Sequence, residues 1–230
     1  MNKKTTYLTN TVLVFVLLGV VFFGFSGINV PIYQEASAIY NGNKEKKQIS
    51  LMFNVYENTD VVYGIIEVLE RYNAKCTFFV GGCWADDNSD ALKRIVESGN
   101  EIANHGYFHK DHKKLSYEQN KKEIVNTEKV VYALCGAKTT LFAPPSGSYS
   151  KTTVSCAEDL GYKVIMWTKD TIDWRDKDTS LIYRRATENI SNGDLILMHP
   201  KEQTLQILPK ILEYYADLGY NAIIVSDNIK

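Results

Sequence analysis

The histidines of this 230-residue chain are few and clustered. Four are present, and three of them, His105, His109 and His112, fall within eight residues. His105 and His109 directly follow a short apolar segment, and His199 ends another apolar segment, 194–199. Imidazole is the most common side-chain metal ligand, and its unperturbed pKa lies near neutrality. Histidines at strand ends therefore predict a metal site or acid–base chemistry, although polar residues of a turn explain His105 and His109 equally well.

Other chemically useful residues also follow apolar segments. In parallel α/β barrels the active site is built from the loops that follow the carboxyl ends of the strands. Five such loops are therefore expected to meet at one cavity. Their residues are Asn54 and Glu57 after the first strand, His105 and His109 after the third, 144–149 after the fourth, Asp170, Asp173 and Trp174 after the fifth, and His199 at the end of the sixth.

The elements that must position these residues alternate along the chain from Ile49 onward. Strands alternating with helical patterns indicate a parallel sheet. Seven strands in so short a domain predict a small α/β barrel, with an open doubly wound sheet as the alternative. The expected strands are 49–54, 76–81, 101–104, 140–143, 162–167, 194–199 and 221–226, and the expected helices are 61–73, 88–98, 116–134, 150–160, 178–191 and 205–218.

Composition excludes several classes of function. The chain has 26 basic and 27 acidic residues and a formal net charge of −1, without the basic excess that a nucleic-acid-binding protein usually carries. Neither common glycine-rich phosphate-binding pattern is present. The four cysteines contain no C-x-x-C pair, so a cysteine zinc site is not expected and free thiols are favoured over disulfides.

The N-terminus has the pattern of a membrane segment. Lys3 and Lys4 precede an uncharged apolar run, 11–28, close to the ~20 residues that a membrane helix needs. The positive-inside rule then leaves the N-terminus in the cytoplasm. A cleaved signal peptide and a secreted protein are the alternative, but the small-x-small sequence 36–38 lies rather far beyond the apolar run. We expect a cytoplasmic tip and single membrane anchor (1–30), a polar linker (31–48) and an extracytoplasmic domain (49–230).

Motifs in the loops make residues 49–226 similar to the polysaccharide deacetylase family, also called the NodB homology domain or carbohydrate esterase family 4. The resemblance implies a distorted (β/α)7 barrel. The matching segments are 105–109 for the metal motif H-[ST]-x-x-H, with Gly106 at the hydroxyl position; 197–199 for L-x-H; 170–174 for D-x-x-D-W; and 143–147 for R-P-P-x-G, with Ala143 in place of arginine.

The resemblance also implies an activity and a set of site residues. Family members use a divalent metal, usually zinc, and remove acetyl groups from N-acetylated sugars of cell-wall or chitin-like polymers. Here the metal would be held by His105 and His109, and His199 would be the general acid, oriented by Asp173. The residues expected against the sugar are Pro145, Tyr149, Trp174 and Leu197.

The first family motif, F-D-D-G, is the one that departs most, because this chain has Phe53-Asn54-Val55-Tyr56. Asn54 stands at the position of the general base, and an amide does not accept a proton near neutral pH. General acid–base catalysis typically contributes ~10²–10⁴ in rate. Val55 stands where the acidic metal ligand should be and cannot bind metal. Since the family's arginine contacts the base, its replacement by Ala143 is electrostatically consistent with the loss of that carboxylate.

Glu57 is the nearest acid that could compensate. Catalytic zinc usually has three protein ligands, and His105 and His109 supply two. Glu57 is therefore the candidate third ligand or replacement base, with a solvated loop acid as the alternative, whereas Asp111 and His112 are expected at the surface. Two main hypotheses follow: a metal-dependent hydrolase that deacetylates cell-wall glycan, or a catalytically impaired member that binds or scaffolds such a glycan. A third alternative is the hydrolysis of another amide or ester, since a changed first motif could suit a different acyl group.

Overall fold

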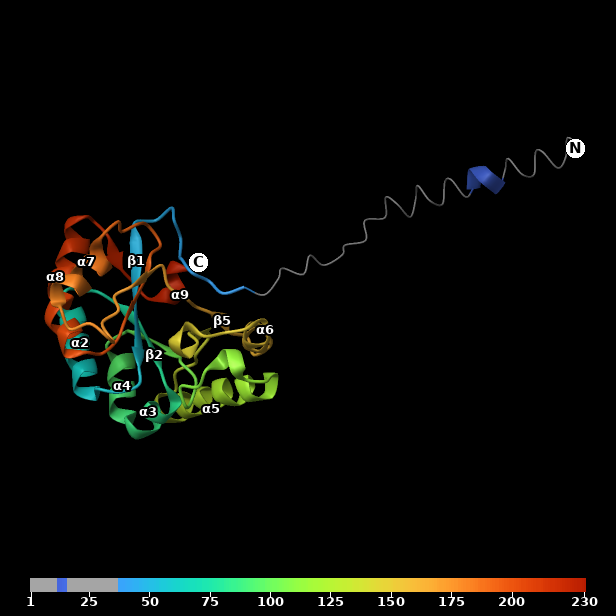
Figure 1. Cartoon of the computed structure of the whole chain (residues 1–230), viewed down its shortest axis with the longest axis horizontal. Helices are drawn as coiled ribbons and strands as arrows, with labels where there is room; N and C mark the ends of the chain where they lie inside the picture. The colour runs from blue at the N-terminus through green and yellow to red at the C-terminus, as the bar shows by residue number, and fades with distance from the viewer. Residues whose placement is uncertain (1–11, 16–36) are drawn as a thin grey trace, which may run out of the picture. The chain divides into compact units, whose positions relative to one another are not determined.

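The computed structural model describes residues 12–15 and 37–230 (Figure 1). The expected membrane anchor, 1–30, lies outside the described residues except for 12–15. Within the described ranges, no helix combines the length and apolar character required to span a bilayer.

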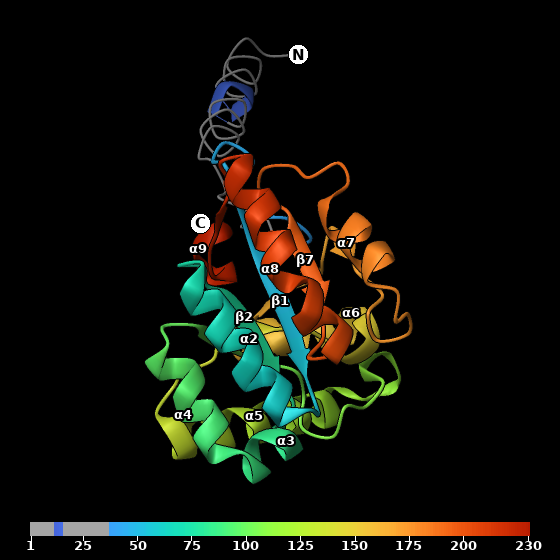
Figure 2. The ribbon, with the colours of Figure 1, turned by 90° about the vertical axis from the view of Figure 1, so that its left-hand side faces the viewer.

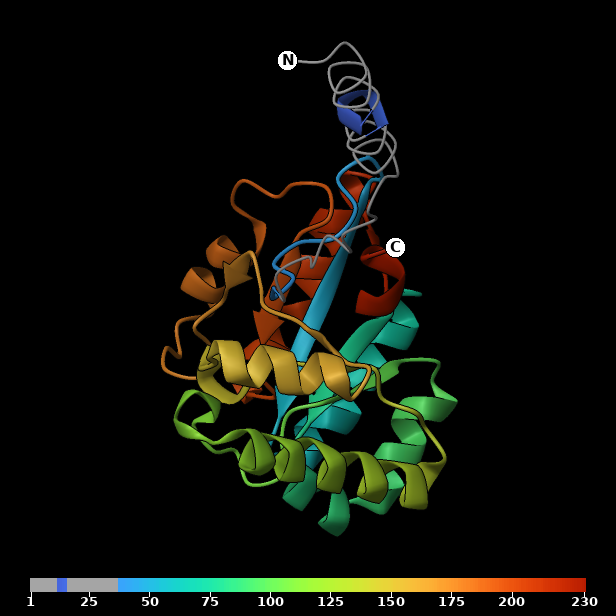
Figure 3. The ribbon, with the colours of Figure 1, turned by 90° about the vertical axis from the view of Figure 1, so that its right-hand side faces the viewer.

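A curled parallel sheet forms the centre of the domain, and its longest strand is β1, Gln48–Val55 (Figures 2 and 3). The strand order is β5-β4-β3-β2-β1-β7-β6, and β8 pairs with the start of β1. No pairing joins β5 to β6 in the described part of the chain, so the expected barrel is a curled half-barrel. The strands are β1 (Gln48–Val55), β2 (Cys76–Val80), β3 (Glu101–Asn104), β4 (Leu141–Phe142), β5 (Lys163–Val164), β6 (Lys169–Asp170), β7 (Leu195–Met198) and β8 (Asn221–Ala222).

Helices connect the strands and cover the outer face of the sheet (Figures 2 and 3). They are α2 (Thr59–Arg71), α3 (Gly82–Asp87), α4 (Ser89–Glu97), α5 (Tyr117–Cys135), α6 (Lys151–Asp159), α7 (Thr179–Thr187), α8 (Glu202–Asp217) and α9 (Val225–Asn228), with short 3-10 turns at His112–Lys114 and Pro145–Gly147.

Helix α5 begins with a capping box. The Ser116 hydroxyl accepts from the backbone N–H of Gln119, and the Gln119 side chain accepts from the backbone N–H of Ser116. These reciprocal bonds satisfy N–H groups that have no partner within a helix. The helix ends at Cys135, and the capping residue Gly136 has a left-handed conformation with φ of 70°.

Two expected features of the C-terminal half differ in the structure. The strand predicted at 221–226 ends at Ala222, and Val225–Asn228 forms the short helix α9. Tertiary contacts override the apolar pattern here, since the backbone N–H of Val225 donates to the Thr77 hydroxyl. Strand β6 was not predicted, because its two residues, Lys169 and Asp170, are both polar.

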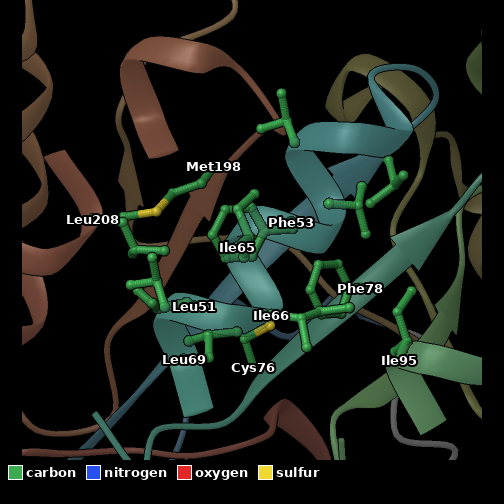
Figure 4. Close-up of a cluster of buried hydrophobic side chains, with 14 of the residues drawn as sticks. Leu51, Phe53, Ile65, Ile66, Leu69, Cys76, Phe78, Ile95, Met198 and Leu208 are labelled. Carbon is green, nitrogen blue, oxygen red and sulfur yellow. The ribbon is translucent and has the colours of Figure 1, made fainter. Parts of the chain in front are cut away.

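Alternation along β1 decides which side chains face the helices and which face the inside of the curled sheet. Leu51, Phe53 and Val55 belong to the main apolar cluster under α2 and beside β2 (Figure 4). Met52 belongs to a separate cluster on the other face. Successive side chains of a strand point to opposite faces, so Asn54 shares its face with Met52 and points away from the helices.

Residues 37–47, which belong to the segment expected as a linker, are hydrogen-bonded to the domain. The backbone of Ile39 bridges Ile165 at the edge of β5, with Ile39 N–H donating to the Val164 carbonyl at 2.8 Å. Gly42 N–H likewise donates to the carbonyl of Gly193 at 2.7 Å. Residues 37–47 therefore belong to the folded domain.

Candidate functional site

A cavity of about 580 Å³ lies at the carboxyl end of the sheet. All five loops that were expected to meet contribute to it, so the structure brings together residues as far apart in the sequence as Asn54 and Lys201. The lining residues are Asn54, Tyr56, Glu57, His105, His109, Ser146, Trp167, Asp170, Trp174, Leu197, His199, Pro200 and Lys201.

His199 is held at the end of β7 by a buried carboxylate. Asp173 is completely buried; its Oδ1 lies 2.8 Å from His199 Nδ1, and its Oδ2 accepts from the backbone N–H of His199 at 2.7 Å. The Thr204 hydroxyl donates to the same Oδ2 at 2.6 Å. Because Nδ1 is engaged, Nε2 is the ring nitrogen that His199 can offer to a ligand in the cavity.

His105 and His109 lie beside each other, with ring centroids 5.2 Å apart. His105 is 1% exposed, and its Nδ1 lies 2.7 Å from the carbonyl oxygen of Ala143, an acceptor that requires the proton on Nδ1. Burial, followed by the neighbouring His109, lowers the pKa of His105 to about 3. Burial also lowers the pKa of His109. Both imidazoles are therefore held toward the neutral form, which is the form that binds metals.

Asn54 and Val55 point into different environments. Asn54 lines the cavity, is 5% exposed, and its Oδ1 has no hydrogen-bond partner among the described residues. Val55 is fully buried in the apolar cluster under α2 and does not line the cavity. The next residue, Tyr56, places its ring 4.9 Å from the ring of His109. The position expected to carry an acidic ligand thus carries an apolar core residue.

Glu57 reaches the rim of the cavity but is bound by another side chain. Its carboxylate forms an ion pair with the ammonium group of Lys201, which lies across the rim in the loop after β7. The Glu57 side chain is 58% exposed, and that of Lys201 is 24% exposed. The structure does not assemble His105, His109 and Glu57 into a metal site.

The divalent metal implied by the family resemblance can be tested against this donor set. Across residues 12–15 and 37–230, no three side chains of His, Cys, Asp or Glu are grouped so that they could hold a metal ion. His105 and His109 supply two imidazoles, Val55 supplies none, and Glu57 is paired with Lys201. Catalytic zinc usually requires three protein ligands. The residues described here therefore do not fit such a centre.

The expected sugar-binding residues are divided between the cavity and its surroundings. Trp174, 55% exposed, and Leu197 line the cavity. Pro145 and Tyr149 are not among the lining residues: Pro145 is buried, and the Tyr149 hydroxyl lies 2.7 Å from that of Tyr40.

Sequence reasoning missed several lining residues, of which Trp167 and Lys201 are the most informative. Trp167 follows β5, and a β-carbon at Gly147 would lie 2.6 Å from its ring. Gly147, with φ of 63°, therefore leaves the space that the indole occupies. An aromatic residue at the end of the predicted strand 162–167 was the available signal for Trp167.

His112 was expected at the surface, and this prediction is wrong. It is completely buried, with Nδ1 2.7 Å from the side-chain oxygen of Asn120 and its ring packed on Phe142. Its Nε2 has no hydrogen-bond partner among the described residues.

Asp111 is partly exposed and accepts from the Ser148 hydroxyl at 2.5 Å. The four cysteines are free thiols, as expected.

Comparison with known proteins identifies this arrangement. A family model described as polysaccharide deacetylase matches residues 41–165, more than half of the chain. The chain belongs to the polysaccharide deacetylase family. The match includes the loops of Asn54 and of His105 and His109, so the departures at Asn54, Val55 and Ala143 are changes within the family's own framework.

Two relatives from bacteria each match about four fifths of this chain. The chain is 34% identical to the protein YlxY of Bacillus subtilis over 79% of its own length and 57% of that protein's. It is 29% identical to the peptidoglycan-N-acetylglucosamine deacetylase PgdA of Listeria monocytogenes, over 80% of this chain and 39% of PgdA. It thus spans roughly half of these relatives.

A solved structure of the family has the same fold with high similarity. It is that of BA3943 from Bacillus anthracis, described as a pseudoenzyme of carbohydrate esterase family 4. The identity is 32%, the TM-score is 0.82, and the match covers 85% of this chain and 69% of that one. A mutant of BA3943 is described as having restored enzymatic activity.

Proposed function

We propose that this protein binds an N-acetylated glycan of the cell wall, of the peptidoglycan type, in the cavity at the carboxyl end of the sheet, and that it hydrolyses the acetamide poorly or not at all. The observation that carries the proposal is Asn54, which lines the cavity at the position of the family's catalytic base. An amide cannot take up the proton of an attacking water, so the most direct source of general base catalysis is absent.

The other carboxylates of the cavity are engaged in bonds of their own. Glu57 pairs with Lys201, and Asp170 accepts from the backbone N–H of Ile172 at 2.8 Å. Neither is free to replace the base without losing that contact. The cavity itself is intact, and exposed Trp174 offers a flat apolar face of the kind that suits a sugar ring. Retained binding with weakened chemistry follows from this combination.

The choice of glycan rests on the relatives, among which PgdA is named for peptidoglycan N-acetylglucosamine. We also place the domain outside the cytoplasm, held by the N-terminal segment or secreted, because that is where such a polymer is found. Protease accessibility of the domain on intact cells tests the location: the domain is expected to be cleaved without lysis, and protection would contradict this placement.

Binding and turnover are separated by one pair of assays on the purified full chain. Calorimetric titration with β-1,4-linked N-acetylglucosamine tetramer is expected to show saturable binding. Incubation with the same tetramer, with and without added zinc, is expected to release no acetate above a protein-free control. Acetate release at a rate typical of enzymes, or an absence of binding, would overturn the proposal. A Trp174→Ala variant, which removes the apolar face, is expected to weaken the binding.

A second candidate is the metal-dependent deacetylase itself. The observation that favours it is the retention of His105, His109 and the His199–Asp173 pair around one cavity. If this candidate is correct, acetate release depends on an added divalent metal and is lost in His199→Ala. The same assay therefore decides between the two functions.

A further inference from the structure

Tyr56 places an aromatic ring on the wall of the cavity, directly beyond the end of β1. Successive side chains of a strand alternate between its two faces. Tyr56 therefore continues the side of Asn54, whereas Val55 points into the apolar cluster under α2. Tyr56 is 37% exposed, so part of its surface remains open to a ligand in the cavity.

Three neighbours fix the orientation of this ring. It lies 4.9 Å from the ring of His109, tilted by 56°. One of its edges lies over Gly81, where an added β-carbon would overlap it. Burial, followed by the thiol of Cys83, raises the pKa of the Tyr56 hydroxyl, so this end of the side chain is directed toward α3. The exposed part of Tyr56 is therefore mainly its ring.

The cavity also has an exposed aromatic side chain in another loop. Trp174 is 55% exposed and follows β6. Strand β7, which carries His199 at its end, separates β6 from β1 in the sheet, so Tyr56 and Trp174 line different sides of the cavity. Binding pockets for small molecules are usually lined by apolar and aromatic side chains, with a few polar groups that fix the orientation of the ligand.

A sugar ring of a β-1,4-linked gluco-configured chain is complementary to such a wall. It has two flat faces of C–H groups and a rim of polar substituents. Aromatic side chains bury a large apolar area with a rigid, flat shape. Since Val55 supplies no metal ligand, an aromatic face is the contact that the loop after β1 can offer to this ligand.

We propose, building on the glycan-binding function above, that Tyr56 stacks on a C–H face of the sugar ring bound in the cavity and supplies a large part of its affinity. Position 56 corresponds to the glycine of the motif F-D-D-G, where no side chain could make this contact. The same change that removes the two acids thus adds an aromatic ring. The loop holds a sugar in place of a metal.

The test titrates the N-acetylglucosamine tetramer into the full chain and its variants. Tyr56→Leu removes the flat ring but keeps an apolar side chain, and its Kd is expected to rise by about tenfold. Tyr56→Phe keeps the ring, and its Kd is expected to stay within about twofold of the wild-type value. Tyr132→Leu is the matched control, because Tyr132 is 56% exposed on α5 and does not line the cavity. Its Kd is expected to equal that of the wild type.

Direct contact is measured by NMR on protein in which only the tyrosines carry carbon-bound protons. Tyr56 is the only tyrosine among the described residues that line the cavity. Nuclear Overhauser effects from tyrosine ring protons to the C–H protons of the tetramer are therefore expected. They should disappear in Tyr56→Phe, although this variant still binds. Circular dichroism and thermal unfolding check that each variant is folded.

The failure of this inference differs from the failure of the proposed function. An unchanged Kd in Tyr56→Leu, an equal loss of affinity in Tyr56→Phe or in Tyr132→Leu, or binding without the tyrosine signals would overturn the role of Tyr56 while leaving glycan binding in place. Absence of binding to the wild-type chain would overturn the proposed function and the role of Tyr56 together.

Discussion

Asp173 binds His199 at two points, with one carboxylate oxygen 2.8 Å from Nδ1 and the other 2.7 Å from the backbone nitrogen. Because Asp173 is completely buried, these bonds form away from solvent, where the orientation of the ring is strongly constrained. The pair joins the loop after β6 to the end of β7. It keeps His199 Nε2 available even though Asn54 replaces the base.

Replacement of Asp173 should release this constraint. In the neutral wild-type ring the proton is expected on Nδ1, facing Asp173, and in Asp173→Asn the two tautomers are expected to mix. Two-dimensional ¹⁵N NMR of the histidine rings distinguishes these states. In Asp173→Ala the loss of a buried acceptor for His199 and Thr204 is expected to cost about 1–3 kcal/mol in the free energy of unfolding. An unchanged His199 spectrum in both variants would show that Asp173 does not position the ring.

Zinc is expected to have little effect on the stability of this protein. A ligand present at its Kd stabilises a protein by about 0.4 kcal/mol, which corresponds to a shift of about 1–2 °C in Tm. His105 and His109 lack a third metal ligand among the described residues, so any zinc binding should have a Kd of about 100 µM or weaker. The Tm of the full chain in 100 µM zinc should therefore lie within about 1–2 °C of its Tm in a chelator. A zinc-dependent rise of more than about 5 °C that disappears in His109→Ala would reveal a tight site.

Two features of the structure favour glycine at position 106: a positive φ and the closeness of the His112 side chain. Its φ is 73°, and a β-carbon there would lie 2.9 Å from His112 Nε2. A non-glycine residue in the left-handed region costs about 1–3 kcal/mol. Gly106→Ala should therefore be more destabilising than Gly161→Ala, where φ is 79° but no atom lies within 4 Å of the added carbon. Urea unfolding of both variants measures the difference, and equal losses would mean that His112 moves aside freely.

Protonation of Asp176 at low pH should destabilise the loop that also contains Asp173 and Trp174. Hydrogen bonds from Arg175 and then Arg185 lower the pKa of Asp176 from 3.8 to about 2. A carboxylate whose pKa is lower in the folded state stabilises it fully above the unfolded value, and this contribution is lost as the pH falls from 3.8 toward 2. The wild-type chain should thus exceed Asp176→Asn in Tm above pH 5, by a margin that shrinks between pH 4 and pH 2.

The comparison is made between the two proteins at each pH, because other carboxylates titrate in the same range. A constant difference in Tm between wild type and Asp176→Asn from pH 6 to pH 2.5 would show that the two arginines do not favour the ionised form of Asp176.

The parts of the fold that could be predicted are those with local signals. Strands β2 and β7 are almost entirely apolar and β1 is largely so, as buried parallel strands usually are. Strand β6 has two polar residues and forms through its pairing with β7, so no local sequence pattern predicts it. The residues 221–226 have an apolar strand pattern, yet tertiary contacts place half of them in or beside a helix.

The candidate site shows the same division. His105, His109 and His199 could be selected because histidine is rare in this chain and stands at strand ends. Lys201 lines the cavity as well, but lysine is common on protein surfaces, so its residue type does not predict a place in the site. The pairing of Glu57 with Lys201 joins residues 144 positions apart and has no local signal.

Glu57 is the acid that the first loop offers in place of the lost base, and its role can be tested through its ion pair with Lys201. If Glu57 serves only as the partner of Lys201 at the rim, Glu57→Gln removes a partly exposed ion pair, which is typically worth no more than about 1 kcal/mol. Glycan affinity, zinc content and acetate release should then equal those of the wild type. Lys201→Met is the matched variant, because it breaks the same ion pair and leaves the carboxylate free. A gain of acetate release in Lys201→Met that is absent from the double variant with Glu57→Gln would show that Lys201 holds Glu57 back from acting as a base.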